Sequence, residues 1–269
     1  MSYEKVHLTQ EKETLLATLY ARALESRSPN PILSDPRAEE AVRRIDYDFA
    51  RLKVDTLSIA MRARQFDLWT LAFLKEHPDA VALNLGCGLD SRVYRVDPPA
   101  GVLWFDVDFP EVIELRRKLF PAQQCCEMVG ADLAELGWLE KLPADRPAWI
   151  VLEGVSMYLT MDVMNSLLHA LTEHFASGAI AFDAIAPAAV KMARGNRSVR
   201  ATGATFGGFA IDDPQELKKV APKLELAEDV RTPDLPGYAK LPLATRALVR
   251  VVDSIPSLRK LSRILMYRF

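Results

Sequence analysis

Residues 81–92, VALNLGCGLDSR, set the architecture that we expect for this chain. Apolar residues alternate up to Leu85 and are followed by Gly86 and Gly88, which is typical of a buried strand bounded by glycines. Because glycine has no Cβ atom, the backbone at these two positions can approach a bulky group closely. At the carboxyl end of a strand in an open α/β sheet, that group is usually a nucleotide-like ligand. A single Gly-x-Gly is also an ordinary turn, so the interpretation depends on the segments that follow.

Strand and helix patterns alternate after this stretch. Strands are expected over 81–85, 102–107, 125–129, 148–152 and 179–183, helices near Arg92 and over 110–120, 135–141 and 161–175, and late strands over 224–230 and 264–269. Such alternation specifies a parallel sheet with helices on both faces. We therefore predict an α/β, Rossmann-like fold with a mostly parallel, twisted sheet.

Three helices are predicted before the first strand, over 11–24, 35–45 and 55–75. Asp35 followed by Pro36 is typical of a helix cap with a proline in the first turn. We expect residues 1–78 to form an N-terminal helical cap and residues 79–269 to form the core. A basic, glycine-containing segment near 188–209 is interpreted either as a lid-like insertion that closes over an anionic substrate or as a solvated surface segment.

Composition excludes several classes of protein. The 269 residues carry a formal net charge of −2, which argues against nucleic-acid binding because that needs a concentrated basic surface. There is no apolar run long enough to span a membrane, and the first residues, MSYEKVHLTQEKET, are too polar for a signal peptide. Three cysteines without CxxC spacing and four scattered histidines indicate a reducing, cytoplasmic location and no metal site.

The predicted helix over 55–75 contains an unusual cation. Arg62 lies on the same helical face as Phe66, Trp69 and Phe73. A buried arginine needs an anionic partner, so Arg62 is a candidate ligand-binding residue. The alternatives are that its stem lies on apolar surface with the guanidinium in water, or that Arg64, on another face, has this role.

The expected strands also end in acidic residues. Asp106 and Asp108 close the second strand, about 20 residues beyond the glycine turn, where nucleotide-binding sheets hold a ribose diol; we prefer Asp108 for this role and regard Asp106 as structural. Asp132 would accept a hydrogen bond from an adenine amine, and the Leu133 amide would donate to a ring nitrogen. Glu153 ends the fourth strand, at the same predicted sheet edge. Alternatively, Asp108 and Asp132 are ordinary caps of the turns that follow them.

Several of these motifs together resemble a known family. NLGCGLDSR, WFDVDFPEV, ADL and EGVSMYLT are similar to the leucine carboxyl methyltransferase-like family, which includes polyketide-tailoring O-methyltransferases. TLLATLYARALES and IDYDF also resemble the amino-terminal part of that family, so the likeness covers roughly residues 10–185. The resemblance implies a class I methyltransferase that uses S-adenosylmethionine.

The resemblance also implies roles for individual residues. The implied cofactor contacts are Gly86 and Gly88 in the glycine turn, Asp108 at the ribose, Asp132 and Leu133 at the adenine, Glu153 at the methionine moiety and Arg62 at the cofactor carboxylate. Asn84 and Cys87 depart from the family pattern, which we expect to be tolerated because the backbone makes the close approach. Tyr158 is the candidate for contact with the substrate.

The expected reaction is methyl transfer to a carboxylate or hydroxyl oxygen of a small, polyketide-like acceptor. A carboxylate is already ionised and needs no base, whereas a hydroxyl needs one, and the sequence identifies no such base. Nothing in the sequence indicates an oligomeric state.

Three alternatives stay open. A nicotinamide-dependent oxidoreductase would share the glycine turn, but Ser91 occupies the third glycine position and no catalytic His/Lys/Tyr set is present. A non-catalytic nucleotide-binding module would lack turnover of the cofactor. A third alternative, within the same family, is methylation of the carboxyl terminus of a protein.

Overall fold

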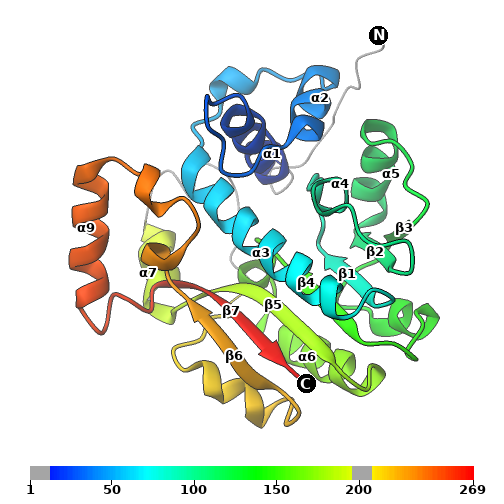
Figure 1. Ribbon diagram of the computed structural model, residues 1–269. Coiled ribbons are helices and arrows are strands. Elements are labelled where there is room, and N and C mark those ends of the chain that lie inside the picture. The colour runs from blue at the N-terminus through cyan, green and yellow to red at the C-terminus, as the bar shows by residue number, and fades with distance from the viewer. Residues whose placement is uncertain (1–12, 196–207) are drawn as a thin grey trace.

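The computed structural model describes residues 13–195 and 208–269, and within them the chain forms one seven-stranded sheet (Figure 1). The strands are β1 (Val81–Leu85), β2 (Leu103–Asp108), β3 (Cys126–Gly130), β4 (Ala148–Leu152), β5 (Gly178–Ile185), β6 (Glu225–Val230) and β7 (Ser262–Arg268). Their order is β3-β2-β1-β4-β5-β7-β6. Neighbours from β3 to β5 are parallel, whereas β7 is antiparallel to both β5 and β6. The predicted α/β fold with a mostly parallel sheet is confirmed.

The order reverses between β1 and β4, and this is the position at which open α/β sheets bind ligands. Both strands are buried along their whole length. Successive side chains point to opposite faces, so Leu83 packs in the cluster that includes helix residue Leu167, and Ala82 packs in the cluster that includes Phe66. The apolar run of β4, and that of β1 with Asn84 as its one polar residue, are therefore explained by helices on both faces.

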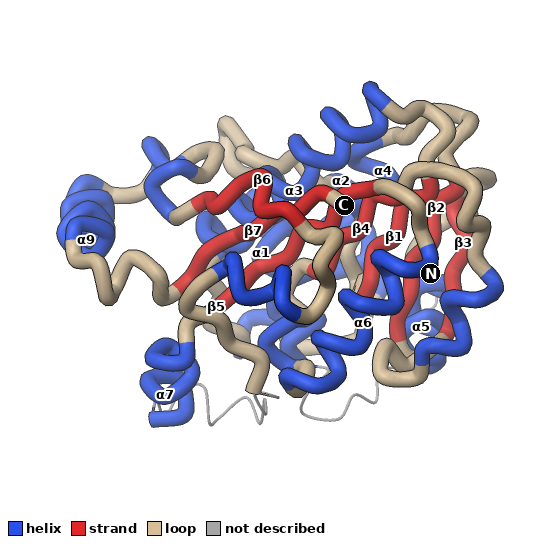
Figure 2. Tube along the Cα trace, turned by 90° about the horizontal axis from the view of Figure 1, so that it is seen from below, coloured by secondary structure: helices blue, strands red, loops and turns tan. Residues whose placement is uncertain are grey.

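Helices cover both faces of the sheet (Figure 2). The α-helices are α1 (Glu13–Ser26), α2 (Pro36–Arg44), α3 (Thr56–Glu76), α4 (Arg92–Val96), α5 (Pro110–Leu119), α6 (Met161–His174), α7 (Pro187–Gly195) and α9 (Leu243–Ser254). The 3-10 helices are η2 (Phe49–Arg51), η3 (Leu136–Lys141), η4 (Ser156–Tyr158), η5 (Pro214–Lys219), η6 (Thr232–Asp234) and η7 (Tyr238–Lys240). Helix α3 runs along one face and α6 packs against the other.

Side-chain caps fix where several helices begin. The Asp35 carboxylate accepts a hydrogen bond from the Ala38 amide at 3.0 Å, and Pro36 occupies the first turn of α2, as predicted. The hydroxyl oxygen of Thr160 accepts from the Val163 amide at 3.2 Å at the start of α6. These caps satisfy amides that have no partner within the helix. They therefore fix the residues at which α2 and α6 begin.

One predicted helix has another form, and one helix was not predicted. The helix expected over 135–141 is the 3-10 helix η3. The first part of the segment interpreted as a lid-like insertion forms α7, and the lid itself stays a prediction. Helix α9 was not predicted at all; its Leu243 and Leu248 side chains are exposed, and the helix lies at the margin of the molecule (Figure 1). The rest of the predicted lid, residues 196–207 with Arg197 and Arg200, lies outside the described residues.

The amino-terminal helices are joined to the core by buried charges. Arg95 of α4 makes an ion pair with Asp35 at 2.9 Å, and Arg22 of α1 donates to the Leu89 carbonyl at 2.7 Å. Helix α3 belongs both to this amino-terminal group and to the cover of the sheet, because its Phe66 and Trp69 side chains pack against strand residues. The boundary between a cap over 1–78 and a core over 79–269 stays a prediction.

Candidate functional site

A cleft of about 250 Å³ opens at the carboxyl ends of β1 and β4. It is lined by residues of α1, α3 and the turns that follow the two strands: Thr14, Leu15, Thr18, Arg22, Ile59, Arg62, Asn84, Gly86, Cys87, Gly88, Leu89, Asp90, Glu153, Gly154, Met157 and Tyr158. Five predicted site residues, Arg62, Gly86, Gly88, Glu153 and Tyr158, are therefore brought together. We call this space the cofactor cleft, after the role that the sequence predicts for these residues.

The glycine turn after β1 has a backbone conformation that favours glycine. Gly86 has φ +62°, and a Cβ atom there would lie 2.4 Å from Cγ2 of Val155. Gly88 has φ +48°, and its amide donates to Oδ2 of Asp108 at 2.7 Å. Residues other than glycine rarely adopt positive φ, so the backbone favours glycine at both positions, and the close contact with Val155 leaves no room for a Cβ atom at Gly86.

Arg62 is held in the cleft by two carboxylates. Its Nε donates to Oε1 of Glu153 at 3.1 Å, and its Nη1 donates to Oδ2 of Asp183 at 3.2 Å. Burial acts to lower the pKa of Arg62, but these carboxylates outweigh it and raise that pKa. The anionic partner expected for Arg62 is present and comes from the protein itself, and 23% of the side chain stays exposed. Its contact with a cofactor carboxylate stays a prediction.

Glu153 connects Arg62 to a fully buried second arginine. Its Oε2 accepts a hydrogen bond from Nη2 of Arg92, which also donates from Nε to Asp67 of α3 at 2.9 Å and from Nη1 to Oδ1 of Asn84 at 3.3 Å. Both carboxylate oxygens of Glu153 are thus engaged by guanidinium groups. The orientation of Glu153 at the cleft is therefore fixed by residues from α3, α4 and β1.

Asp108, Asp132 and Leu133 lie on the same sheet edge as Glu153 but outside the lining of the cleft. Asp108 ends β2, accepts from the Gly88 and Phe109 amides at 2.7 Å each, and has its pKa raised by burial. Asp132 follows β3, and its Oδ1 accepts from the Ala134 amide at 2.9 Å, as a turn-capping residue does. Their expected roles at the ribose and adenine of a cofactor stay predictions.

Asp106 has the structural role that was predicted for it. Its Oδ1 accepts from Nδ2 of Asn84 at 3.1 Å and from Nε1 of Trp104 at 2.9 Å, and its Oδ2 is bound by buried Arg116. Asn84, treated as a tolerated departure from the family pattern, therefore joins Asp106 to Arg92. The departure is compensated by polar contacts within the core.

Asp183 was missed by the sequence analysis. It belongs to β5, is 5% exposed, binds Arg62, and accepts from the Gly154 amide through Oδ1 at 2.6 Å. Burial raises its pKa, although Arg62 and the Gly154 amide act to lower it. The signal was present, because the fifth predicted strand ends in an acid as the preceding strands do.

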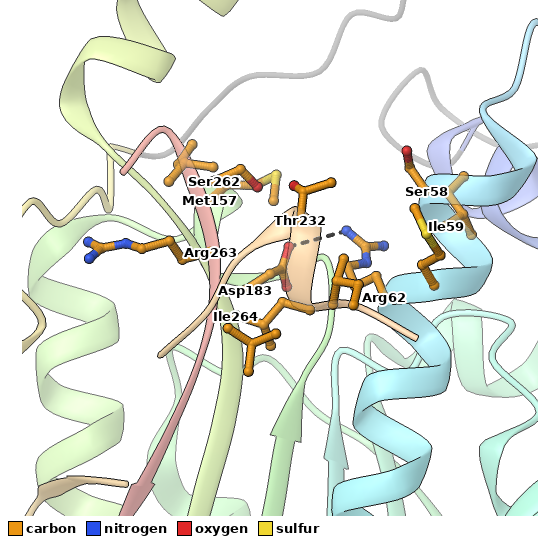
Figure 3. Close-up of a pocket in the computed structure, with 13 residues that line it drawn as sticks. Ser58, Ile59, Arg62, Met157, Asp183, Thr232, Ser262, Arg263 and Ile264 are labelled. Atoms are coloured by element: carbon orange, nitrogen blue, oxygen red, sulfur yellow. Dashed lines mark hydrogen bonds and ion pairs between the residues drawn. The ribbon is translucent and has the colours of Figure 1, made fainter. Parts of the chain in front are cut away.

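A second cavity of about 240 Å³ borders the cofactor cleft, and we call it the side cavity (Figure 3). Its lining comes from α3, β5, the segment from β6 into η6 and the start of β7: Ser58, Ile59, Met61, Arg62, Met157, Asp183, Ile185, Val230, Thr232, Leu235, Ser262, Arg263 and Ile264. Ile59, Arg62 and Met157 line both spaces. The two spaces therefore adjoin each other at these three side chains.

In residues 13–195 and 208–269, no group of three or more His, Cys, Asp or Glu side chains is arranged to hold a metal ion. None of the helices described has the length and apolar character to cross a membrane. The three cysteines are free, and burial raises the pKa of Cys87 in the cleft.

The known proteins that this chain resembles in sequence are methyltransferases. The sequence profile of leucine carboxyl methyltransferase matches residues 15–172. The tetracenomycin polyketide synthesis O-methyltransferase TcmP of Streptomyces glaucescens is 43% identical over 269 residues, which cover 99% of both chains. The S-adenosyl-L-methionine-dependent methyltransferase dpfgK of Gibberella zeae is 37% identical over 261 residues, covering 88% of this chain and 87% of that protein.

Solved structures agree on the fold. A DUF574 family protein from Streptomyces avermitilis matches with a TM-score of 0.58 at 15% identity, over 97% of this chain and 99% of that chain. At this level of identity the likeness concerns the architecture alone. The arrangement of the sheet and its helices is therefore shared with a distantly related protein.

Proposed function

The chain belongs to the leucine carboxyl methyltransferase family and is an S-adenosylmethionine-dependent methyltransferase; we propose that it methylates an oxygen atom of a small, polyketide-like molecule. The relative TcmP, named for O-methylation in polyketide synthesis, matches this chain over nearly its whole length and supports the acceptor class. Neither a nicotinamide-dependent oxidoreductase nor a binding module without turnover is supported by these relatives.

We assign the cofactor to the cleft because its residues suit the groups of S-adenosylmethionine. The partly exposed Arg62 guanidinium would bind the cofactor carboxylate, Glu153 would face the methionine moiety, and the glycine turn would allow close approach of the nucleoside. Asp108 would bind the ribose, and Asp132 with the Leu133 amide would bind the adenine. When bound, the cofactor supplies a methyl group on positively charged sulfur, and the carbon–sulfur electron pair stays on sulfur as the carbon–oxygen bond forms.

The protein contributes mainly by positioning. A neutral thioether leaves, so the leaving group needs no acid. Holding the acceptor oxygen in line with the methyl group and excluding water supplies up to about 7–11 kcal/mol of the barrier reduction. A carboxylate acceptor reacts as it is, whereas a hydroxyl acceptor must give up its proton. Tyr158, at the edge of the cleft, is the proposed substrate-contact residue.

The observation that carries this proposal is the cleft between the glycine turn and Arg62. We expect S-adenosylhomocysteine to raise the melting temperature of the protein, because a ligand that binds only the folded state stabilises it. NAD should produce no such shift. Stabilisation by NAD and not by S-adenosylhomocysteine would contradict the assignment of the cleft. Incubation with S-adenosylmethionine and a panel of aromatic acids and phenols should then release S-adenosylhomocysteine.

A further inference from the structure

Helix α9 turns its apolar side toward solvent. Leu248 is 64% exposed, and Ala244, Val251 and Ile255 are exposed as well. Their spacing of three or four residues places these four side chains along one side of the helix, with Ile255 just beyond its last residue. We call them the outer stripe of α9. A surface helix normally turns its apolar residues toward the core, so this orientation indicates a contact outside the protein.

The opposite side of α9 attaches the helix to the protein through polar contacts. Nη1 of Arg231, the residue before η6, donates to Oδ2 of Asp253 at 3.0 Å. The hydroxyl of Tyr238 in η7 donates to the carbonyl oxygen of Arg246 at 2.9 Å. Because Asp253 and Arg246 are half-buried, this side is the inner one. Among the residues that the structure describes, the outer stripe is therefore left uncovered.

The segment that contains α9 is strongly basic. Residues 240–260 hold five basic side chains and one acidic side chain, whereas the whole chain has a formal net charge of −2. The acidic residue, Asp253, is paired with Arg231, and the basic residues Arg250 and Arg259 are exposed. The five basic residues are Lys240, Arg246, Arg250, Arg259 and Lys260. An apolar stripe with basic neighbours is complementary to a surface that is both apolar and negatively charged.

We propose that α9 binds the surface of an anionic lipid bilayer. The outer stripe inserts between the lipids, and the neighbouring basic side chains bind phosphate-containing headgroups. A helix of this kind lies in the plane of the membrane with its apolar side about 5–10 Å deep. Helix α9 lies at the margin of the molecule in both views (Figure 1 and Figure 2), so a flat surface can reach it.

This inference goes beyond the proposed function and does not rest on it. No residue of α9 lines the cofactor cleft or the side cavity. Membrane contact by α9 therefore leaves both spaces unobstructed. The result of a test on α9 is also independent of what binds in the cleft.

A second copy of the chain suits the outer stripe less well. Helix α9 has 12 residues, so its outer side measures about 18 Å by about 10 Å. That is much less than the roughly 800 Å² that each partner buries in a standard interface. A two-fold contact also brings the same surface of both copies together, so the basic side chains of the two helices would repel each other.

The test measures co-sedimentation of the full chain with vesicles. We expect binding to vesicles of phosphatidylglycerol and phosphatidylcholine in equal parts, and much weaker binding to vesicles of phosphatidylcholine alone. Added salt should weaken the binding because it screens the headgroup charge. Leu248→Gln should lower the affinity about tenfold or more, since an inserted leucine is lost. Arg250→Gln should lower it about fivefold, since one cation near the surface is lost.

Matched control variants replace the same residue types elsewhere. Leu71→Gln changes an exposed leucine of α3, and Arg43→Gln changes an exposed arginine of α2. Both should bind the mixed vesicles as the unmodified protein does. Glutamine is a good helix former, so all four variants should keep the melting temperature of the unmodified protein.

Several results would overturn the membrane site. They are absence of binding to the mixed vesicles, equal binding to vesicles without anionic lipid, and equal affinity of the α9 variants and their controls. Analytical ultracentrifugation covers the other occupants. A dimer that Leu248→Gln dissociates would assign the outer stripe to a second copy of the chain. A monomer that binds no vesicles would assign it to an acidic protein partner.

Discussion

Arg62 is a cation whose orientation is fixed before any ligand arrives. Two carboxylates, from Glu153 and Asp183, hold its guanidinium, and Glu153 is itself held by buried Arg92. Buried charges are costly unless they are paired and hydrogen-bonded. The two carboxylates therefore allow a charged guanidinium to stay partly buried at the cleft. A ligand carboxylate then binds without having to order a flexible side chain, which improves affinity.

Removing this side chain should weaken cofactor binding. We expect Arg62→Ala to lose about 2–5 kcal/mol of binding free energy for S-adenosylhomocysteine, because a charged, hydrogen-bonded partner is truncated. That loss corresponds to an affinity lowered from about tens-fold to thousands-fold. Isothermal titration calorimetry measures it directly. Arg64→Ala is the matched control, since Arg64 lies two positions along the same helix and outside the lining of the cleft; equal affinities of the two variants would refute the role of Arg62.

The sequence predicted Arg62 but not the network around it. A cation on an apolar helix face is visible as a break in a regular pattern, and this made Arg62 a candidate. Asp183 ends the fifth predicted strand, as acids end the preceding ones, but its pairing with Arg62, 121 positions away in the sequence, is visible only in the folded chain. Asn84 likewise gains its role from Asp106 and Arg92, which only the folded chain brings together.

The turn between β1 and α4 is an element in which sequence and structure agree closely. Gly86 and Gly88 both have positive φ, and the Gly86 amide donates to the Val107 carbonyl at 2.8 Å. The turn therefore follows the sheet edge tightly, and it passes against Val155 without space for a Cβ atom. An alanine at Gly86 would meet both the unfavourable conformation and the valine.

Gly86→Ala should therefore destabilise the ligand-free protein. We expect a loss of about 1–3 kcal/mol in the free energy of unfolding, measured by urea denaturation, because a side chain is forced into a strained φ. Gly137→Ala is the control: no heavy atom lies within 4 Å of a Cβ built there, and its φ is not positive. Equal stability of the two variants would show that the turn relaxes and that its glycine is not required for folding.

Helices and strands could be predicted from the sequence where the apolar residues of the pattern are also the buried residues of the structure. The strands β1 and β4 were predicted with their observed ends because both are buried throughout and are apolar at every position except Asn84. Helix α9 was missed because the structure gives it no buried residue, so its apolar side chains do not mark a core face. The segment η3 was predicted as an ordinary helix. Over so few residues, the spacing of apolar side chains does not distinguish a 3-10 helix from an α-helix.

At the level of the entire fold, buried ion pairs connect helices from the first third of the chain to the sheet. Asp90 follows the glycine turn and lies among Arg92, Arg95 and Arg22. Burial acts to raise the pKa of Asp90, but these three guanidinium groups outweigh it and lower that pKa well below its ordinary value. One carboxylate thus joins α1 and α4 beside the cofactor cleft.

This pairing makes stability depend on pH. A carboxyl group whose pKa is lowered by folding stabilises the protein fully above its unfolded pKa, near 3.9, and that contribution is lost as pH falls toward the folded pKa. Asp90→Asn should therefore be destabilised at pH 7, by about 3–5 kcal/mol for a broken buried pair. Its deficit relative to the unmodified protein should shrink by about 1.4 kcal/mol for each pH unit below about 3.9.

Urea unfolding between neutral and acidic pH measures this difference, and an exposed aspartate separates it from general effects of acid. The side chain of Asp145 is 75% exposed, and within the part of the chain that the structure describes its ion pair is with Arg146 at 3.8 Å. Asp145→Asn should match the unmodified protein closely across the same pH range, because exposed ion pairs contribute little. A deficit of Asp90→Asn that stayed constant down to the most acidic condition would contradict this prediction. It would mean that the arginines do not stabilise the Asp90 carboxylate, and that this carboxylate does not join α1 to α4.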